Sequence, residues 1–230
     1  MLIVAAAAVL LVKEWLPFGR YLLYPFTLLT TWVHEMGHGL TAIAVGGSFE
    51  RLVVFADAGG YAQSRFAPGW PQALVSVGGL LAPPLVGALL LAIVRGPRRA
   101  RVALLGLAIA LAGSAVIWVR SPVGLVTVGG FAVLFALAGV KGGPSLRMWL
   151  VQIVAVVCAL DTLTRMVEYA FMKTITSGAM SGARSDVANA AEALGVPHLL
   201  VALGVVAAAL ALLALGVWAG LRQPAAERPR

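Results

Sequence analysis

The sequence is poor in charged residues and in cysteine. Only 11% of its 230 residues are charged, whereas 61% are hydrophobic, and the mean hydropathy is +0.96. A soluble domain carries about a quarter charged residues, so this composition excludes a soluble globule. The single cysteine, Cys158, excludes an internal disulfide and a cluster of thiolate metal ligands.

Long apolar stretches separated by short polar connectors are typical of a helical protein that crosses the membrane several times. The first stretch is the weakest, because its apolar run ends at Val12 and a span needs about 20 residues. We predict an all-α bundle of six or seven transmembrane spans, with a single domain over 1–221 and a polar tail over 222–230. The expected spans are 1–16, 20–46, 72–94, 100–119, 123–140, 147–172 and 197–221.

Basic residues outnumber acidic residues by 17 to 9. They lie mainly in connectors between apolar stretches, which favours membrane topology over nucleic-acid binding as their explanation. The densest group is "RGPRRAR" at residues 95–101, a connector that we expect on the cytoplasmic side. This orientation predicts a cytoplasmic C-terminus and places the connector 47–70 outside. The bilayer is the expected partner, and nucleic acid is not.

Two polar connectors contain predicted secondary structure. Within 47–70, the runs "RLVVF" and "YAQSRF" have strand-forming residues and flank a Gly-containing turn, so they predict a small β-hairpin. Within 173–196, the run "SDVANAAEAL" predicts a short helix whose N-cap is Ser185 or Asp186.

The stretch "TTWVHEMGHGL" holds two of the three histidines of the chain. Residues four apart share one face of a helix, so His34 and His38 can bind one zinc ion. Glu35 is then placed to take a proton from the attacking water and to pass it to the leaving amine. Ionisable residues within an apolar span are costly and usually functional, and the alternative to a metal site is a proton relay or a structural polar cluster.

A catalytic zinc ion usually has three protein ligands. Asp161 lies in an apolar stretch and, like His34, is about 21 Å along its helix from a basic residue on the inner side, at 1.5 Å per residue. It could instead form an ion pair with Arg165 on the same helix. Asp186 is the alternative third ligand, unless it serves only as a helix N-cap.

The HExxH in a span, the following "GGY" at residues 59–61 and the stretch "LVSVGGLLAPPLVGALLL" resemble the site-2 protease family of intramembrane zinc metalloproteases. The sequence is most similar to the compact bacterial branch without PDZ or CBS domains. The resemblance implies that His34 and His38 bind Zn²⁺, that Glu35 is the general base and that Asp161 is the third ligand. "ALDTL" departs from the family pattern, because no glycine follows the aspartate and no Asn-Pro precedes it.

The resemblance also implies a multi-pass protein of the bacterial cell membrane that cuts a membrane protein or peptide within or next to a transmembrane segment. The helical substrate must unwind, because a helix keeps its carbonyl groups in hydrogen bonds. The hairpin could bind the unwound peptide as an added strand near Gly59, Gly60 and Tyr61, or simply cover the site. The alternative functions are a zinc-binding membrane protein that does not cleave peptides and, with less support, a metal or proton transporter.

Overall fold

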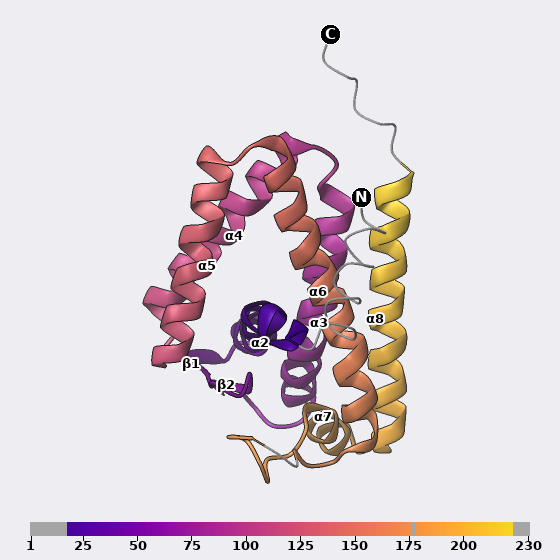
Figure 1. The fold of residues 1–230 in the computed structure, drawn as a ribbon. Helices are drawn as coiled ribbons and strands as arrows, with labels where there is room; N and C mark the ends of the chain where they lie inside the picture. Colours follow the sequence, from indigo (N-terminus) through magenta and orange to yellow (C-terminus); the bar gives the residue numbers. More distant parts are fainter. Residues whose placement is uncertain (1–17, 176–177, 223–230) are drawn as a thin grey trace.

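A computed structural model describes residues 18–175 and 178–222; the side chains of residue 20 and of residues 160–171 lie outside this description. Most of the described chain is helical, with one two-stranded sheet (Figure 1). In chain order the elements are α2 (Gly19–Ala44), β1 (Ser48–Val54), β2 (Gly60–Arg65), α3 (Trp70–Ile93), α4 (Pro97–Ile117), α5 (Pro122–Lys141), α6 (Pro144–Phe171), α7 (Asp186–Leu194) and α8 (His198–Leu221).

Helices α3 to α6 run up and down, joined by short connectors, and α8 lies beside α3 and α6 (Figure 1). Three of these helices start with a proline, at Pro97, Pro122 and Pro144. Proline suits the first helical position, because its fixed φ matches the helix and its missing N–H would have no partner there. The short connectors therefore make sharp reversals that keep neighbouring helices antiparallel.

Helix α2 crosses the other helices rather than running alongside them. Figure 1 shows α2 almost along its own axis, whereas α3, α6 and α8 are seen from the side. Near its start, Phe26 contacts Phe131 of α5, with ring centroids 5.5 Å apart. One turn and a half further on, the buried Trp32 donates a hydrogen bond of 2.9 Å from Nε1 to Ser114 Oγ of α4. The motif-bearing helix is thus held by several elements of the bundle.

The two strands form an antiparallel hairpin in which Val54 pairs with Gly60. The second edge of β1 is also occupied: the Leu52 N–H donates to the Trp118 carbonyl at 2.8 Å, and the Arg120 N–H donates to the Leu52 carbonyl at 2.9 Å. The α4–α5 connector therefore closes the β1 edge of the sheet, and β2 supplies its outer edge.

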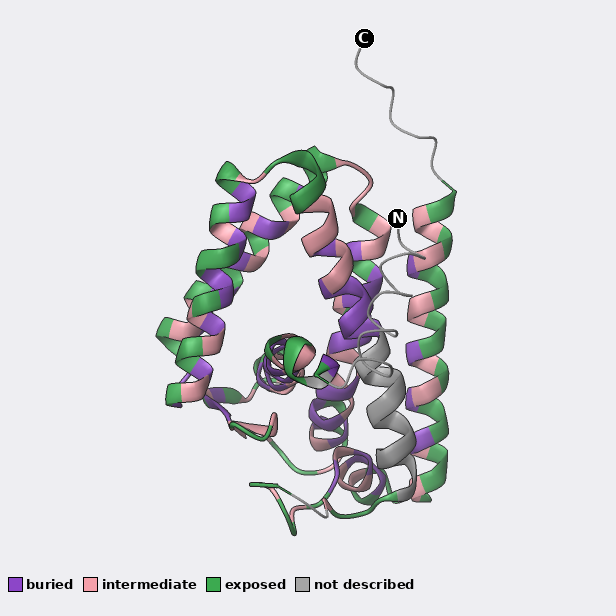
Figure 2. Cartoon of the chain, viewed as in Figure 1, coloured by how far each residue is buried: buried purple, intermediate pink, exposed green. Residues whose placement is uncertain are grey.

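Large apolar side chains on the outer helix faces remain exposed, while the inner faces are buried (Figure 2). On α4, Val102, Ile109 and Val116 recur every seven residues and are 71%, 74% and 78% exposed. A continuous apolar outer face is expected where lipid rather than water surrounds the helices. This pattern agrees with the composition.

The predicted helical class and the hairpin are confirmed, and so is the short helix with its cap: Ser185 Oγ accepts a hydrogen bond from the Ala188 N–H at the start of α7. Among the described residues, four helices are long and apolar enough to cross a membrane, namely α3, α4, α5 and α8. Six or seven spans and the single domain over 1–221 stay predictions, because residues 1–17 and 223–230 lie outside the description.

Candidate metal centre

Helix α2 brings His34 and His38 together on one face, with their Nε2 atoms 3.1 Å apart. The third group is Asp186, the first residue of α7, whose Oδ2 lies 3.1 Å from His34 Nε2 and 3.2 Å from His38 Nε2. Two imidazole nitrogens and one carboxylate oxygen therefore converge on one point.

These three separations match the geometry of a zinc site. Ligand bonds of about 2.0–2.1 Å in a tetrahedral arrangement place the donor atoms about 3.3 Å apart. Two histidines and a carboxylate are also one of the usual ligand sets of catalytic zinc. Within the described part of the chain, His34, His38 and Asp186 are the one group of three such residues close enough to share an ion.

Helix α3 orients the second histidine. His38 Nδ1 lies 2.8 Å from the carbonyl oxygen of Val75. A carbonyl can only accept, so Nδ1 carries the proton and the lone pair of Nε2 faces Asp186 and His34. A histidine fixed in this way through its second nitrogen is typical of metal ligands.

Glycines allow α3 to approach the histidines this closely. A Cβ atom on Gly79 would lie 2.2 Å from His38 Nε2, and one on Gly78 would lie 2.1 Å from Thr41 Oγ1. On α2, a Cβ atom on Gly37 would lie 2.5 Å from Ala82 Cβ. Small residues let helix backbones pack closely in membranes. Gly78 and Gly79 therefore allow α3 to pack closely against the metal centre, a role that the sequence alone did not predict.

The loop before α7 fixes the position of Asp186. The Ser185 N–H donates to the Lys173 carbonyl at 3.0 Å, and Ser185 Oγ donates to the Met172 carbonyl at 2.9 Å. Ser185 is also the N-cap of α7, so the Asp186 carboxylate is not needed for capping. The loop thus directs the Asp186 side chain towards α2. Asp161 lies on α6, but its side chain is outside the described residues.

Glu35 is buried, with 5% of its surface exposed, and it lies next to the start of β2. A Cβ atom on Gly60 would lie 3.1 Å from Glu35 Cγ and 2.9 Å from the Thr31 methyl carbon. Only a glycine lets the β2 backbone lie against the Glu35 side chain here. The hairpin therefore borders the glutamate of the motif.

A family model for Peptidase M50B-like proteins matches residues 1–216. The chain belongs to the Peptidase M50B-like family. The match confirms the resemblance of the sequence to site-2 proteases. Together with the four apolar helices, it indicates an integral membrane protein. No match was found among curated proteins or among solved structures.

In this M50B-like chain, the hairpin turn is bonded on both sides. Thr31 Oγ1 of α2 donates to the Ala58 carbonyl at 2.7 Å. On the other side, Asp57 Oδ2 accepts from the Ala179 N–H at 2.6 Å, and Oδ1 accepts from the Gly59 N–H at 3.0 Å. These two backbone donors, that of Ala179 first, lower the pKa of Asp57. The turn thus links α2 to the loop that carries Asp186.

Of the three residues predicted to bind substrate, Gly60 contacts the stem of Glu35, and Gly59 belongs to the turn. The Tyr61 ring faces other hairpin side chains: its centroid is 6.0 Å from that of Phe55 and 5.9 Å from the Arg51 guanidinium carbon. Their role in substrate binding stays a prediction.

Proposed function

We propose that this M50B-like protein is an intramembrane zinc metallopeptidase of a bacterial cell membrane, with His34, His38 and Asp186 as metal ligands and Glu35 as general base. The observation that carries the proposal is the convergence of the three donor atoms at 3.1–3.2 Å beside the buried Glu35. Asp186 takes the place that the sequence resemblance gave to Asp161, because its carboxylate already lies within ligand spacing of both histidines.

The residues of the site divide the reaction between them. When zinc is bound, the scissile carbonyl is polarised and the attacking water loses its proton more readily. Glu35 accepts that proton and delivers it to the nitrogen of the leaving amine. The Val75 carbonyl keeps the second histidine in the tautomer that can bind the metal.

The substrate in this proposal is a membrane segment that unwinds beside β2. Among the described residues, backbone hydrogen bonds occupy both edges of β1, whereas β2 bonds only to β1. An unwound peptide can therefore add to the outer edge of β2, as extended peptides add to exposed strands. Gly60 would bring such a peptide close to Glu35. The contrasting role, a cover over the site, is favoured by the hydrogen bonds that join the hairpin turn to Thr31 and to Ala179.

The main alternative is a membrane protein that binds zinc without cleaving peptides. A buried glutamate next to the first histidine favours hydrolysis, since a purely structural metal site has no use for a base. A transporter is less well supported: α3 and α8 contain no Asp, Glu, Lys or Arg, and in α4 and α5 these residues lie only at one end. A path for ions across the bundle would need polar groups along several helices.

Metal analysis tests the first part of the proposal. Purified wild-type protein is expected to hold about one zinc ion per chain, as a three-ligand site implies. The double variant His34→Ala/His38→Ala is expected to hold none. A double variant that keeps a full complement of zinc would exclude this centre.

A further inference from the structure

An arginine in the connector between α3 and α4 has buried nitrogen atoms that lack hydrogen-bond partners. Arg95 follows the C-cap of α3, and its Nη2 donates to the Ala219 carbonyl of α8 at 3.0 Å. Its Nε and Nη1 atoms are also buried, but within the described part of the chain they have no hydrogen-bond partner. A buried cationic donor without an acceptor costs free energy. Arg95 therefore needs an acceptor that the described residues do not supply.

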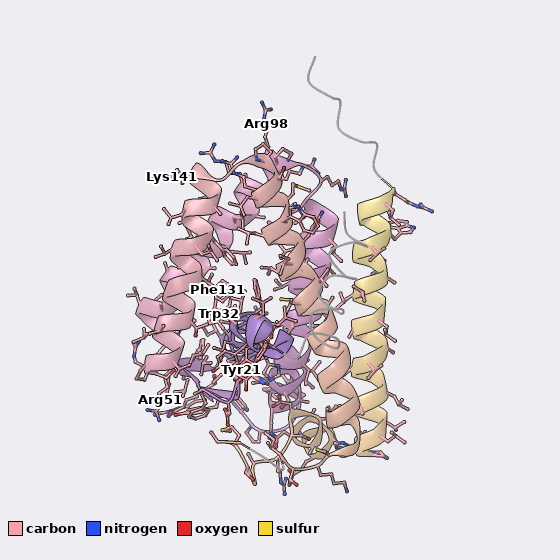
Figure 3. All side chains as sticks on the ribbon, viewed as in Figure 1. Tyr21, Trp32, Arg51, Arg98, Phe131 and Lys141 are labelled. Carbon is pink, nitrogen blue, oxygen red and sulfur yellow. The ribbon has the colours of Figure 1, made fainter. Side chains whose placement is uncertain are left out.

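No described carboxylate lies at this end of the bundle. Figure 3 shows Arg98, near the start of α4, at the end of the molecule where α3 and α8 finish. The acidic side chains that the structure describes belong to α2, the hairpin and α7; they are Glu35, Glu50, Asp57, Asp186 and Glu192. An anion from outside the described chain would therefore complete the hydrogen bonds of Arg95.

A second arginine lies on the same turn of α8. Arg222 is the C-cap of this helix, and its guanidinium carbon is 4.2 Å from the centre of the Trp218 ring. Ala219, which accepts from Arg95, comes three residues before Arg222, so both guanidinium groups belong to the last turn of α8. Arg222 is exposed and can be reached from outside. Tryptophan is common at the level of the lipid headgroups, which suits a site at this depth.

Exposed apolar side chains adjoin the two arginines. Ile93, the last residue of α3, is 52% exposed, and Leu221, the last residue of α8, is 77% exposed. The two helices pack closely, because a Cβ atom on Gly216 of α8 would lie 2.7 Å from the Cα atom of Ala88 on α3. The positive site thus lies at the end of a helix pair with apolar outer residues. A ligand with an anionic head and hydrocarbon chains matches both parts of this surface.

We infer that Arg95 and Arg222 bind the phosphate group of an anionic phospholipid at the ends of α3 and α8, with its acyl chains along the exposed apolar residues. Guanidinium groups are well suited to phosphate, which offers several acceptor oxygens, and basic pockets between membrane helices bind anionic lipid headgroups. Capping the end of α8 is a second role of Arg95, but it uses only Nη2. The inference does not depend on the proposed peptidase function.

Native mass spectrometry of the purified full chain tests the site. The protein in detergent is stripped of lipid and titrated with phosphatidylglycerol, which is anionic, or with phosphatidylcholine, which has no net charge. The wild type is expected to bind one phosphatidylglycerol per chain more tightly than phosphatidylcholine. Arg95→Gln is expected to bind phosphatidylglycerol about 10–100-fold more weakly, because charged hydrogen bonds are lost. Arg98→Gln is the matched control: it removes the same charge from an exposed residue of the same connector region and should bind like the wild type.

Three results overturn the inference. Equal weakening in Arg95→Gln and Arg98→Gln would show that only net charge matters, and equal affinity of the wild type for the two lipids would exclude recognition of an anionic head. The third is displacement of phosphatidylglycerol by an equal concentration of inorganic phosphate, which would make the ligand a free anion. Arg222→Gln, which is also expected to weaken binding, keeps the test decisive if Arg95→Gln fails to fold.

Thermal unfolding separates lipid binding from helix capping. A ligand that binds only the folded state raises the Tm, so phosphatidylglycerol is expected to raise the Tm of the wild type and of Arg98→Gln. It should raise the Tm of Arg95→Gln much less. If Arg95 only caps α8, Arg95→Gln lowers the Tm by the same amount with and without the lipid. That result would overturn the inference.

Discussion

Glu35 is the residue whose chemistry can be separated from its packing. Glu35→Gln keeps the shape of this buried side chain but removes the group that accepts the proton. The variant is expected to bind zinc like the wild type and to cleave a membrane substrate about 10²–10⁴-fold more slowly. Metal analysis and a cleavage assay on the same preparation make the comparison. Wild-type cleavage by Glu35→Gln would show that the glutamate is not the base.

The two aspartates can be distinguished by matched substitutions. Asp186→Asn weakens a donor that lies within 3.2 Å of both histidine nitrogens, so zinc affinity is expected to fall strongly. Asp161→Asn is the control and is expected to bind zinc like the wild type. Zinc titrations of the two purified variants measure the difference. If Asp161→Asn bound zinc more weakly than Asp186→Asn, the third ligand would be Asp161 on α6, as the resemblance implies.

At this scale, the sequence predicted the parts of the site that lie within one helical turn. His34, Glu35 and His38 are recognisable because their spacing is set by the helix alone. The spacing of residues along one helix cannot identify the third ligand, because that ligand comes from another part of the chain. Asp161 lies in an apolar stretch at a depth that matches His34, and its role as a ligand stays a prediction because its side chain lies outside the described residues. Asp186 comes from a connector, and its approach depends on a loop whose course is fixed by Ser185 and its backbone partners.

The α2–α3 crossing depends on glycine. Gly79→Ala places a methyl group within 2.2 Å of His38 Nε2, so the ring or the helix must shift. We expect zinc affinity to fall about 10–100-fold, as it does when the support of a metal ligand is lost. Gly106→Ala on α4 is the control, because its Cβ atom would meet nothing within 4 Å. Zinc titration distinguishes the two variants, and equal affinities would show that the close approach is unnecessary.

The hairpin turn is expected to hold the loop that carries Asp186. Asp57→Ala removes the acceptor of the Ala179 N–H, so this amide should exchange its hydrogen faster and zinc affinity should fall. Asp57→Asn keeps a neutral acceptor and should show a smaller effect. Hydrogen exchange followed by mass spectrometry, together with zinc titration, gives both quantities. Unchanged exchange at Ala179 in Asp57→Ala would show that the contact does not order the loop.

The same contact has a defined pH dependence. The two N–H donors lower the pKa of Asp57, so the folded protein favours the charged carboxylate. The contribution of this contact is therefore fully present above the ordinary aspartate pKa of about 4 and is lost as the pH falls through the lowered value. Protection of the Ala179 amide should be the same at pH 6 and pH 8 and should weaken only in stronger acid. Loss of protection between pH 8 and pH 6 would contradict this assignment.

Elements were predictable where a local signal defined them. Strand-forming runs around a Gly-containing turn gave the hairpin, and Ser185 gave the start of α7. The pairing of β1 with the α4–α5 connector had no such signal, because it joins backbone groups that are far apart in the chain. The packing roles of Gly78 and Gly79 could not be predicted either, because they depend on the α2 side chains that approach these glycines in the folded protein.

For the whole molecule, composition was sufficient to predict a membrane-embedded helical protein, but not the direction of each helix. That residues 20–46 form a span stays a prediction. Figure 1 shows α2 crossing the bundle, and α2 is not among the four described helices that are long and apolar enough to cross a membrane. Hydropathy describes how well each segment fits lipid. It does not describe packing between helices, and packing sets the course of α2 through its contacts with α3, α4 and α5.

His34 and Asp186 are 152 residues apart in the chain, and this separation has a consequence for biosynthesis. A ribosome adds about 5–20 residues per second, so many seconds pass between the emergence of the histidines and that of the aspartate. Throughout this interval the nascent chain lacks one of the three donors. Under the proposed function, a newly inserted chain is therefore expected to be inactive towards neighbouring proteins at the translocon until Asp186 has been added.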